Sequence, residues 1–159
     1  MSLAPPPGSR GIDEVLAAAR ARLVRLDPEP AHLAARRGSV LVDTRPLGQR
    51  EATGTIPGAL VIDRNVIEWR LDPRSDARLP GADSYDTHYI LFCQQGYASS
   101  LAAASLQDLG LHRATDLAGG FVAWRAAGLP VLKPAGPNRS DRHLVSAHPV
   151  AHAAPREDP

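Results

Sequence analysis

Cys93 is the residue with the clearest chemical potential, because it is the only cysteine among 159 residues. A single cysteine forms no internal disulfide, and it completes no zinc site of the usual multi-cysteine kind. It follows the apolar run of residues 88–92 and precedes a helical run that starts near Ser99. Cys93 is therefore either a reactive thiolate at the carboxyl end of a strand, where ligands bind in open parallel sheets, or a small buried hydrophobe.

The loop after Cys93 is suited to holding a negative charge on sulfur. If the loop curls over the thiol, its backbone N–H groups and the N-terminus of the next helix favour a thiolate or persulfide anion. Gly96 permits the positive φ that such a turn requires. Ser99 is the expected cap of the helix. The residues expected to form this anion-binding loop are Gln94, Gln95, Gly96, Tyr97, Ala98 and Ser99.

Apolar patterns predict the elements that place this loop. The runs at 39–43 and 88–92 are almost continuously apolar, which is typical of buried strands in a parallel sheet. Weaker strand candidates and helical segments alternate along the chain, which indicates an α/β fold. The weaker strands are expected at 59–62 and 114–117, and the helices at 12–26, 30–37, 64–71, 99–109 and 120–127.

Composition and charge restrict the class of protein. The net charge is +1 and basic residues are scattered along the chain, so no nucleic-acid partner is indicated. No apolar stretch approaches membrane-spanning length and Met1–Arg10 has no signal-peptide pattern, so we expect no membrane partner. A single cysteine favours a reducing, cytoplasmic location. The six histidines lack metal-ligand spacing, and we expect no metal and no cofactor.

Composition also divides the chain into three parts. Residues 1–29 form an N-terminal extension with an amphipathic helix, and residues 30–132 form the α/β domain. Residues 133–159 are rich in proline, alanine and histidine without periodicity. Because this tail has little apolar surface to offset the entropy of ordering, we expect it to be disordered.

Four segments, in the right order and spacing, resemble the rhodanese-like family. They are Leu41–Arg45, Gly54–Ala59, the Cys93 loop with the helix that ends at Leu109-Gly110, and Gly119–Trp124 continuing to Gly128-Leu129-Pro130. The resemblance covers about residues 30–132. It implies a single domain with an open parallel sheet flanked by helices on both faces.

The resemblance also implies a reaction. In rhodanese-like sulfurtransferases, the loop cysteine takes a sulfane sulfur from thiosulfate or a persulfide donor and carries it as a persulfide to a thiol or other thiophilic acceptor. By this resemblance Cys93 is the catalytic nucleophile and residues 94–99 bind the substrate. Asp43 and Arg45, which end the first core strand, are expected to brace the crevice through an ion pair or backbone hydrogen bonds. No second cysteine in this sequence can resolve the persulfide, so the acceptor comes from outside.

Two positions depart from the family pattern. Many members have an arginine where this loop has Ala98 and a histidine where the earlier turn has Thr55. The missing arginine removes a cation from the pocket and predicts poor use of thiosulfate. It also keeps open a second class of function, a rhodanese-like interaction or sensor module with little turnover.

Two arginines outside the loop are alternative sources of positive charge, and a phosphatase is the competing type of enzyme. Arg64 and Arg70 could supply a cation from a neighbouring segment, although solvated helix positions are the simpler interpretation. Related folds with a longer, arginine-containing cysteine loop hydrolyse phosphate esters. No arginine or lysine lies between Cys93 and Leu111, and phosphoryl transfer needs such a cation, so a phosphatase is disfavoured.

Overall fold

The centre of the fold is a parallel sheet whose strands follow the apolar runs of the sequence. A computed structural model describes residues 1 and 3–134, and its sheet contains β1 (Val40–Asp43), β2 (Leu60–Val61), β3 (Tyr89–Phe92) and β4 (Thr115–Asp116). The spatial order is β2-β1-β3-β4 and all neighbours are parallel, with Val42 opposite both Leu60 and Leu91. The predicted open parallel sheet is confirmed.

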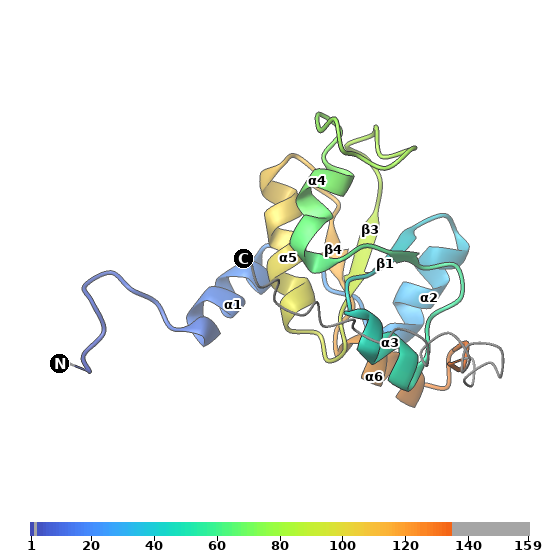
Figure 1. Ribbon diagram of the computed structural model, residues 1–159, viewed down its shortest axis with the longest axis horizontal. Helices are drawn as coiled ribbons and strands as arrows, with labels where there is room; N and C mark the ends of the chain where they lie inside the picture. The colour runs from blue at the N-terminus through green and yellow to red at the C-terminus, as the bar shows by residue number, and fades with distance from the viewer. Residues whose placement is uncertain (2, 135–159) are drawn as a thin grey trace, which may run out of the picture.

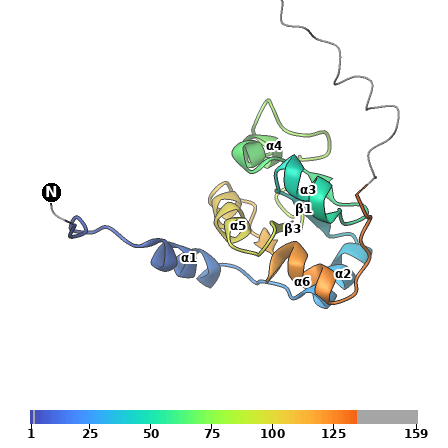
Figure 2. The ribbon, with the colours of Figure 1, turned by 60° about the horizontal axis from the view of Figure 1, so that its bottom comes forward.

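Helices cover both faces of the sheet (Figures 1 and 2). In chain order they are α1 (Ile12–Ala21), α2 (Pro28–Arg36), α3 (Leu47–Thr53), the 3-10 turn η1 (Arg64–Val66), α4 (Ile67–Leu71), α5 (Ala98–Asp108) and α6 (Gly120–Ala126). Successive strand residues face opposite sides, so Leu41 packs with residues of α2 and α6, whereas Val42 packs with residues of α4 and α5. These two apolar clusters make one domain with helices on both faces, as expected.

The leading helix is shorter than the apolar pattern predicted. α1 ends at Ala21, whereas the pattern indicated a helix that continues to Leu26. Leu26 instead lies in an extended segment beside β4, where its N–H donates to the Asp116 carbonyl (3.1 Å) and its own carbonyl accepts from Ala118 N–H (2.8 Å). Because β4 is an edge strand with unpaired backbone groups, this pairing satisfies groups that a longer helix would leave unpaired.

Smaller differences concern helix α3, the start of α2 and the tail. The sequence pattern did not predict α3, because this helix has no buried residue and therefore no apolar face. α2 begins at Pro28, earlier than the expected Pro30. Among the described residues, no helix is both long and apolar enough to cross a membrane. Apart from Lys133 and Pro134, the predicted tail lies outside the described residues.

Candidate active site

Cys93 lies directly after β3, at the carboxyl end of the sheet. The loop that follows β3 leads into α5, and Cys93 borders a crevice of about 460 Å³, called here the Cys93 crevice. This is the edge at which open α/β sheets bind ligands. The other residues that line the crevice are Thr44, Pro46, Gln49, Arg64, Gln94, Gln95, Tyr97 and Ala98.

The Cys93 sulfur is surrounded by hydrogen-bond donors of its own loop. Its Sγ accepts from the backbone N–H of Gly96 (3.2 Å) and of Ser99 (3.4 Å), and lies 3.3 Å from Ser99 Oγ. Gly96 has φ +83°, and a Cβ there would come within 2.8 Å of Gly119 N, so only glycine fits this tight turn. The arrangement stabilises a sulfur that carries negative charge, because backbone donors point at it.

Ser99 does not have the predicted role of a helix cap. α5 begins one residue earlier, at Ala98, and the residue at its N-cap position is Tyr97. Ser99 is fully buried, and its hydroxyl donates to Asp116 Oδ2 (2.9 Å) beside the Cys93 sulfur. The capping prediction is wrong because Ser99 already lies in the first turn of α5, and its hydroxyl donates to a carboxylate of the neighbouring strand that no local pattern identifies.

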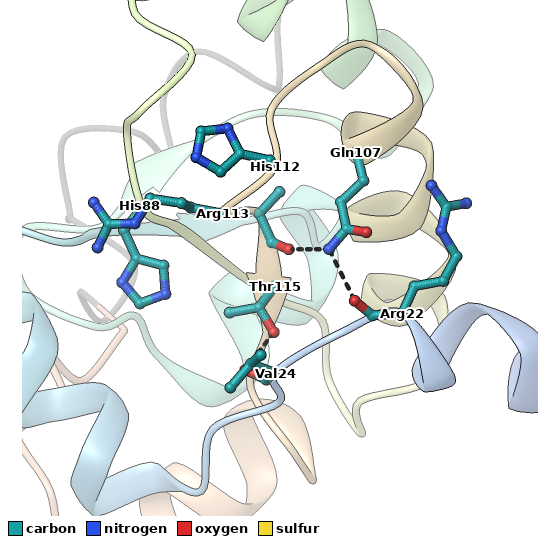
Figure 3. Close-up of a pocket in the computed structure, with 8 residues that line it drawn as sticks. Arg22, Val24, His88, Gln107, His112, Arg113 and Thr115 are labelled. Atoms are coloured by element: carbon teal, nitrogen blue, oxygen red, sulfur yellow. Dashed lines mark hydrogen bonds between the residues drawn. The ribbon is translucent and has the colours of Figure 1, made fainter.

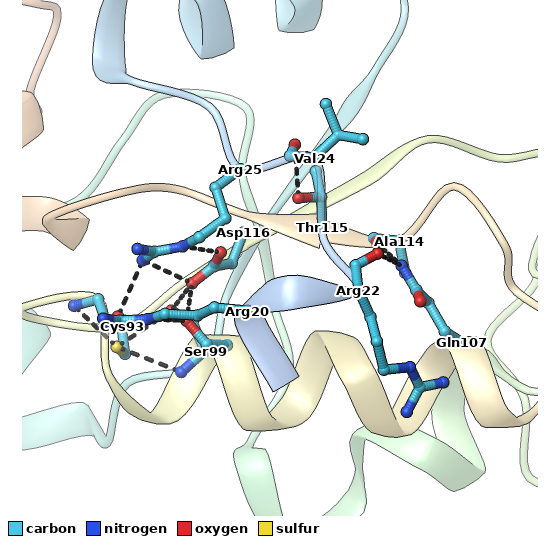
Figure 4. A network of polar contacts seen from close by, with 12 residues as sticks. Arg20, Arg22, Val24, Arg25, Cys93, Ser99, Gln107, Ala114, Thr115 and Asp116 are labelled. Atoms are coloured by element: carbon cyan, nitrogen blue, oxygen red, sulfur yellow. Dashed lines mark hydrogen bonds and ion pairs between the residues drawn. The ribbon is translucent and has the colours of Figure 1, made fainter. Parts of the chain in front are cut away.

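Asp116 is a site residue that the sequence analysis missed. It belongs to β4 and is 0% exposed, yet its carboxylate accepts from the hydroxyls of Ser99 and Ser100 and forms an ion pair with Arg25 at 2.8 Å. Figure 4 shows this network beside Cys93. The available signal was an acidic residue within the strand candidate 114–117, since buried carboxylates require partners.

Asp43 and Arg45 form the predicted ion pair. Both side chains are buried, and Arg45 Nη2 lies 2.8 Å from Asp43 Oδ2. Arg45 also donates to the Gly54 carbonyl (2.8 Å) and to Gln94 Oε1 (3.0 Å). The guanidinium thus connects β1 to the turn at Gly54 and to the Cys93 loop, so this pair braces one wall of the crevice.

The other residues proposed for substrate binding occupy different positions. Gln95, Tyr97 and Ala98 line the Cys93 crevice, whereas Gly96 is buried and does not line it. Arg70 donates to the Ala77 carbonyl (2.6 Å) and does not line the crevice.

Arg64 lines the Cys93 crevice although it lies in a partly exposed helical turn. It stands just after β2 at the same edge of the sheet, and its Nη1 pairs with Glu68. Its side chain is 38% exposed. Among the described residues, its Nε and Nη2 have no protein partner.

A second crevice, of about 290 Å³, lies at the opposite end of the sheet (Figure 3). It is lined by His88, His112 and Arg113, among others, near the amino ends of β3 and β4. Burial lowers the pKa of His88 from 6.5, and the nearby charge of Arg113 lowers it further. No cysteine lines this crevice.

The fold and this site define a class of protein, an α/β domain that holds one cysteine in a loop of backbone donors at the end of a central strand. The family model of the rhodanese-like domain matches residues 28–127, and the chain belongs to this family.

Two relatives support the sulfurtransferase type. The chain is 33% identical over 97 residues to a sulfurtransferase of Allochromatium vinosum. The aligned region covers 61% of this chain and 81% of that protein. It is 34% identical over 101 residues to a thiosulfate sulfurtransferase of Stutzerimonas stutzeri. This second aligned region covers 64% of this chain and 84% of that protein. The chain is a rhodanese domain of the sulfurtransferase type.

Solved structures include two informative neighbours. A Rhodopseudomonas palustris protein of unknown function, described as a possible tyrosine phosphatase, is 33% identical with a TM-score of 0.72, over 81% of this chain and 99% of that one. The homodimeric polysulfide-sulfur transferase of Wolinella succinogenes is 22% identical with a TM-score of 0.63, over 80% and 90% of the two chains. At that lower identity the likeness concerns the fold alone.

Proposed function

We propose that Cys93 carries sulfane sulfur as a persulfide and transfers it between a small donor and an external acceptor. The observation that supports this most directly is the position of the sulfur. Cys93 Sγ accepts from two backbone N–H groups, of Gly96 and Ser99, at the edge of an open crevice. Donors held in this way stabilise a thiolate before the reaction and a persulfide anion after it.

The proposed reaction has two displacements at sulfur. The Cys93 thiolate attacks the sulfane sulfur of thiosulfate, and a new S–S bond forms while the donor's S–S bond breaks and sulfite leaves with the electron pair. With a persulfide donor, a thiolate leaves instead. An acceptor thiolate then attacks the outer sulfur and Cys93 leaves as the thiolate, so no further oxidant or reductant is consumed.

Arg64 is the proposed contact for the oxyanions of thiosulfate. It lines the same crevice as Cys93, and its Nε and Nη2 are available to a ligand in the described part of the chain. A guanidinium recognises sulfonate oxygens through charge-assisted hydrogen bonds. Because Glu68 shares this guanidinium, we expect thiosulfate to be used with a high KM, and a less charged persulfide donor to be affected less.

The test is the mass of the intact protein after exposure to thiosulfate or a persulfide donor. We expect one added sulfur atom that a thiol reductant removes, and no added sulfur on the Cys93→Ser variant, whose hydroxyl cannot form a persulfide. Wild-type protein that takes up no sulfur from either donor would contradict the proposal. That result would favour the interaction or sensor module.

A phosphatase remains the second candidate because one structural neighbour is described as a possible tyrosine phosphatase. The residues do not favour it, since the loop from Cys93 to the first turn of α5 contains no cation to hold a transferring phosphoryl group. An assay with p-nitrophenyl phosphate distinguishes the two reactions. Hydrolysis that depends on Cys93, without sulfur uptake, would replace the sulfurtransferase assignment with the phosphatase.

A further inference from the structure

The N-terminal segment that precedes the family match reaches the Cys93 loop. The rhodanese-like match begins at residue 28, but Arg20 and Arg25 both contact the loop from outside it. Arg20 Nη2 donates to the Gly96 carbonyl at 2.7 Å, and Arg25 Nη2 donates to the same oxygen at 3.1 Å. Figure 4 shows both side chains converging on the loop from the side of α1 and β4.

Each arginine has a second contact that holds it in place. Arg20 Nε donates to Ser100 Oγ (3.1 Å), and its guanidinium lies 5.4 Å from the centre of the Tyr97 ring. Arg25 forms the ion pair with the buried Asp116 at 2.8 Å. Because these partners are in α5, β4 and the loop itself, the two arginines connect the N-terminal segment to all three parts that surround Cys93.

The position of the Gly96 carbonyl has a consequence for the next amide. In a trans peptide the C=O and the following N–H point in opposite directions. Two guanidinium groups hold the Gly96 oxygen on a side of the loop away from the Cys93 crevice, since neither Arg20 nor Arg25 lines that crevice. The Tyr97 N–H therefore points to the opposite side, toward the crevice that Tyr97 lines.

We infer that Arg20 and Arg25 are positioning residues for sulfur transfer, which orient the Gly96–Tyr97 peptide so that the Tyr97 N–H donates to the outer sulfur of the persulfide. Gly96 N–H and Ser99 N–H already contact the inner sulfur, Cys93 Sγ. The third donor would act on the atom that is transferred. The inference deepens the proposed function and rests on it.

Arg20 offers the cleaner test, because removing Arg25 also leaves the buried Asp116 without its cation. Arg22 is the matched control on the same segment. It pairs with the exposed Asp108 at 2.5 Å, and Figure 4 shows its side chain directed away from Cys93. The variants are Arg20→Ala, Arg20→Lys and Arg22→Ala, each checked for folding by circular dichroism.

For Arg20→Ala we expect kcat for sulfur transfer to fall about tenfold with little change in KM for the donor, which corresponds to one charge-assisted hydrogen bond. Arg20→Lys should recover part of this loss, because an ammonium keeps the charge but lacks the fork that reaches both Gly96 and Ser100. Arg22→Ala should match the wild type. If Arg20→Ala does not fold, Arg20→Lys is compared with Arg22→Ala instead, and equal kcat in these two variants would overturn the inference.

A second readout is independent of turnover. In the wild type, the backbone amide NMR signal of Tyr97 should shift when Cys93 is converted to the persulfide, and in the Arg20 variants this shift should be smaller. Equal kcat in Arg20→Ala and Arg22→Ala, or an unchanged Tyr97 signal on persulfidation, would overturn the inference. A wild type that takes up no sulfur would instead contradict the proposed function itself, so the two failures are distinguishable.

Discussion

The contribution of Arg64 to donor binding gives a quantitative prediction. Its guanidinium lines the Cys93 crevice, is 38% exposed, and shares Nη1 with Glu68. A hydrogen bond to a charged group contributes about 1.5–3 kcal/mol, and partial exposure together with competition from Glu68 places Arg64 at the low end. A loss of about 1.4 kcal/mol is tenfold in affinity, so Arg64→Gln should raise the KM for thiosulfate by about tenfold.

The neighbouring residues supply controls in both directions. Glu68→Gln removes the competing carboxylate and should lower the KM for thiosulfate. Arg70→Gln removes a charge from the same segment. The Arg70 side chain donates to the Ala77 carbonyl and lies outside the crevice, so this variant should keep the wild-type KM for thiosulfate. Because Gly96 and Ser99 still contact the sulfur in all three variants, kcat should stay near that of the wild type.

The assay is steady-state transfer from thiosulfate to a thiol acceptor, repeated with a small persulfide donor that lacks a sulfonate. Only the thiosulfate KM should respond to Arg64→Gln. The reasoning is refuted if Arg64→Gln leaves the thiosulfate KM within about twofold of the wild type, or if Arg70→Gln raises it equally. The first result would mean that groups other than Arg64 bind the oxyanions, and the second that only the overall charge of the segment affects the KM.

Three further predictions concern the loop, its buried support and the second crevice. Ala98→Arg adds a cation to the crevice wall and should lower the KM for thiosulfate; an unchanged KM would show that charge at this position does not limit donor binding. Asp116→Asn removes the carboxylate that pairs with Arg25, and because Arg25 is only 22% exposed we expect a loss of about 3 kcal/mol in the free energy of unfolding, measured by urea denaturation; a loss under about 1 kcal/mol would contradict this prediction. The folded-state pKa of His88 lies below 6.5, so the unfolded chain binds a proton first as pH falls, and stability should decrease below about pH 6.5 in the wild type. His88→Asn should reduce this decrease when the free energy of unfolding is measured across that pH range. An equal decrease in the two proteins would contradict the attribution of the pH dependence to His88.

Local chemistry in the sequence determined the sheet and the position of the nucleophile. The apolar runs that became β1 and β3 are buried on both faces, which a continuous run of apolar residues already indicates. Gly96 was expected to adopt positive φ, and its φ of +83° follows from a turn that closes within a few residues of Cys93. The Asp43–Arg45 pair was likewise predictable, because its two members are close neighbours in the chain.

Only the tertiary structure decided which distant groups support that nucleophile. Arg25 and Asp116 are separated by 91 positions, and no periodicity relates them; they meet because Leu26 pairs along the edge of β4. Arg64 reaches the Cys93 crevice because the carboxyl ends of β2 and β3 lie at one edge of a parallel sheet. Ser99 does not cap α5 because the helix already begins at Ala98, and its hydroxyl instead donates to the buried Asp116 carboxylate, which requires partners. Hydrophobic pattern and turn chemistry act over a few residues and are readable in the sequence, whereas these polar contacts form between chain segments that are brought together only by the crossover connections of the fold.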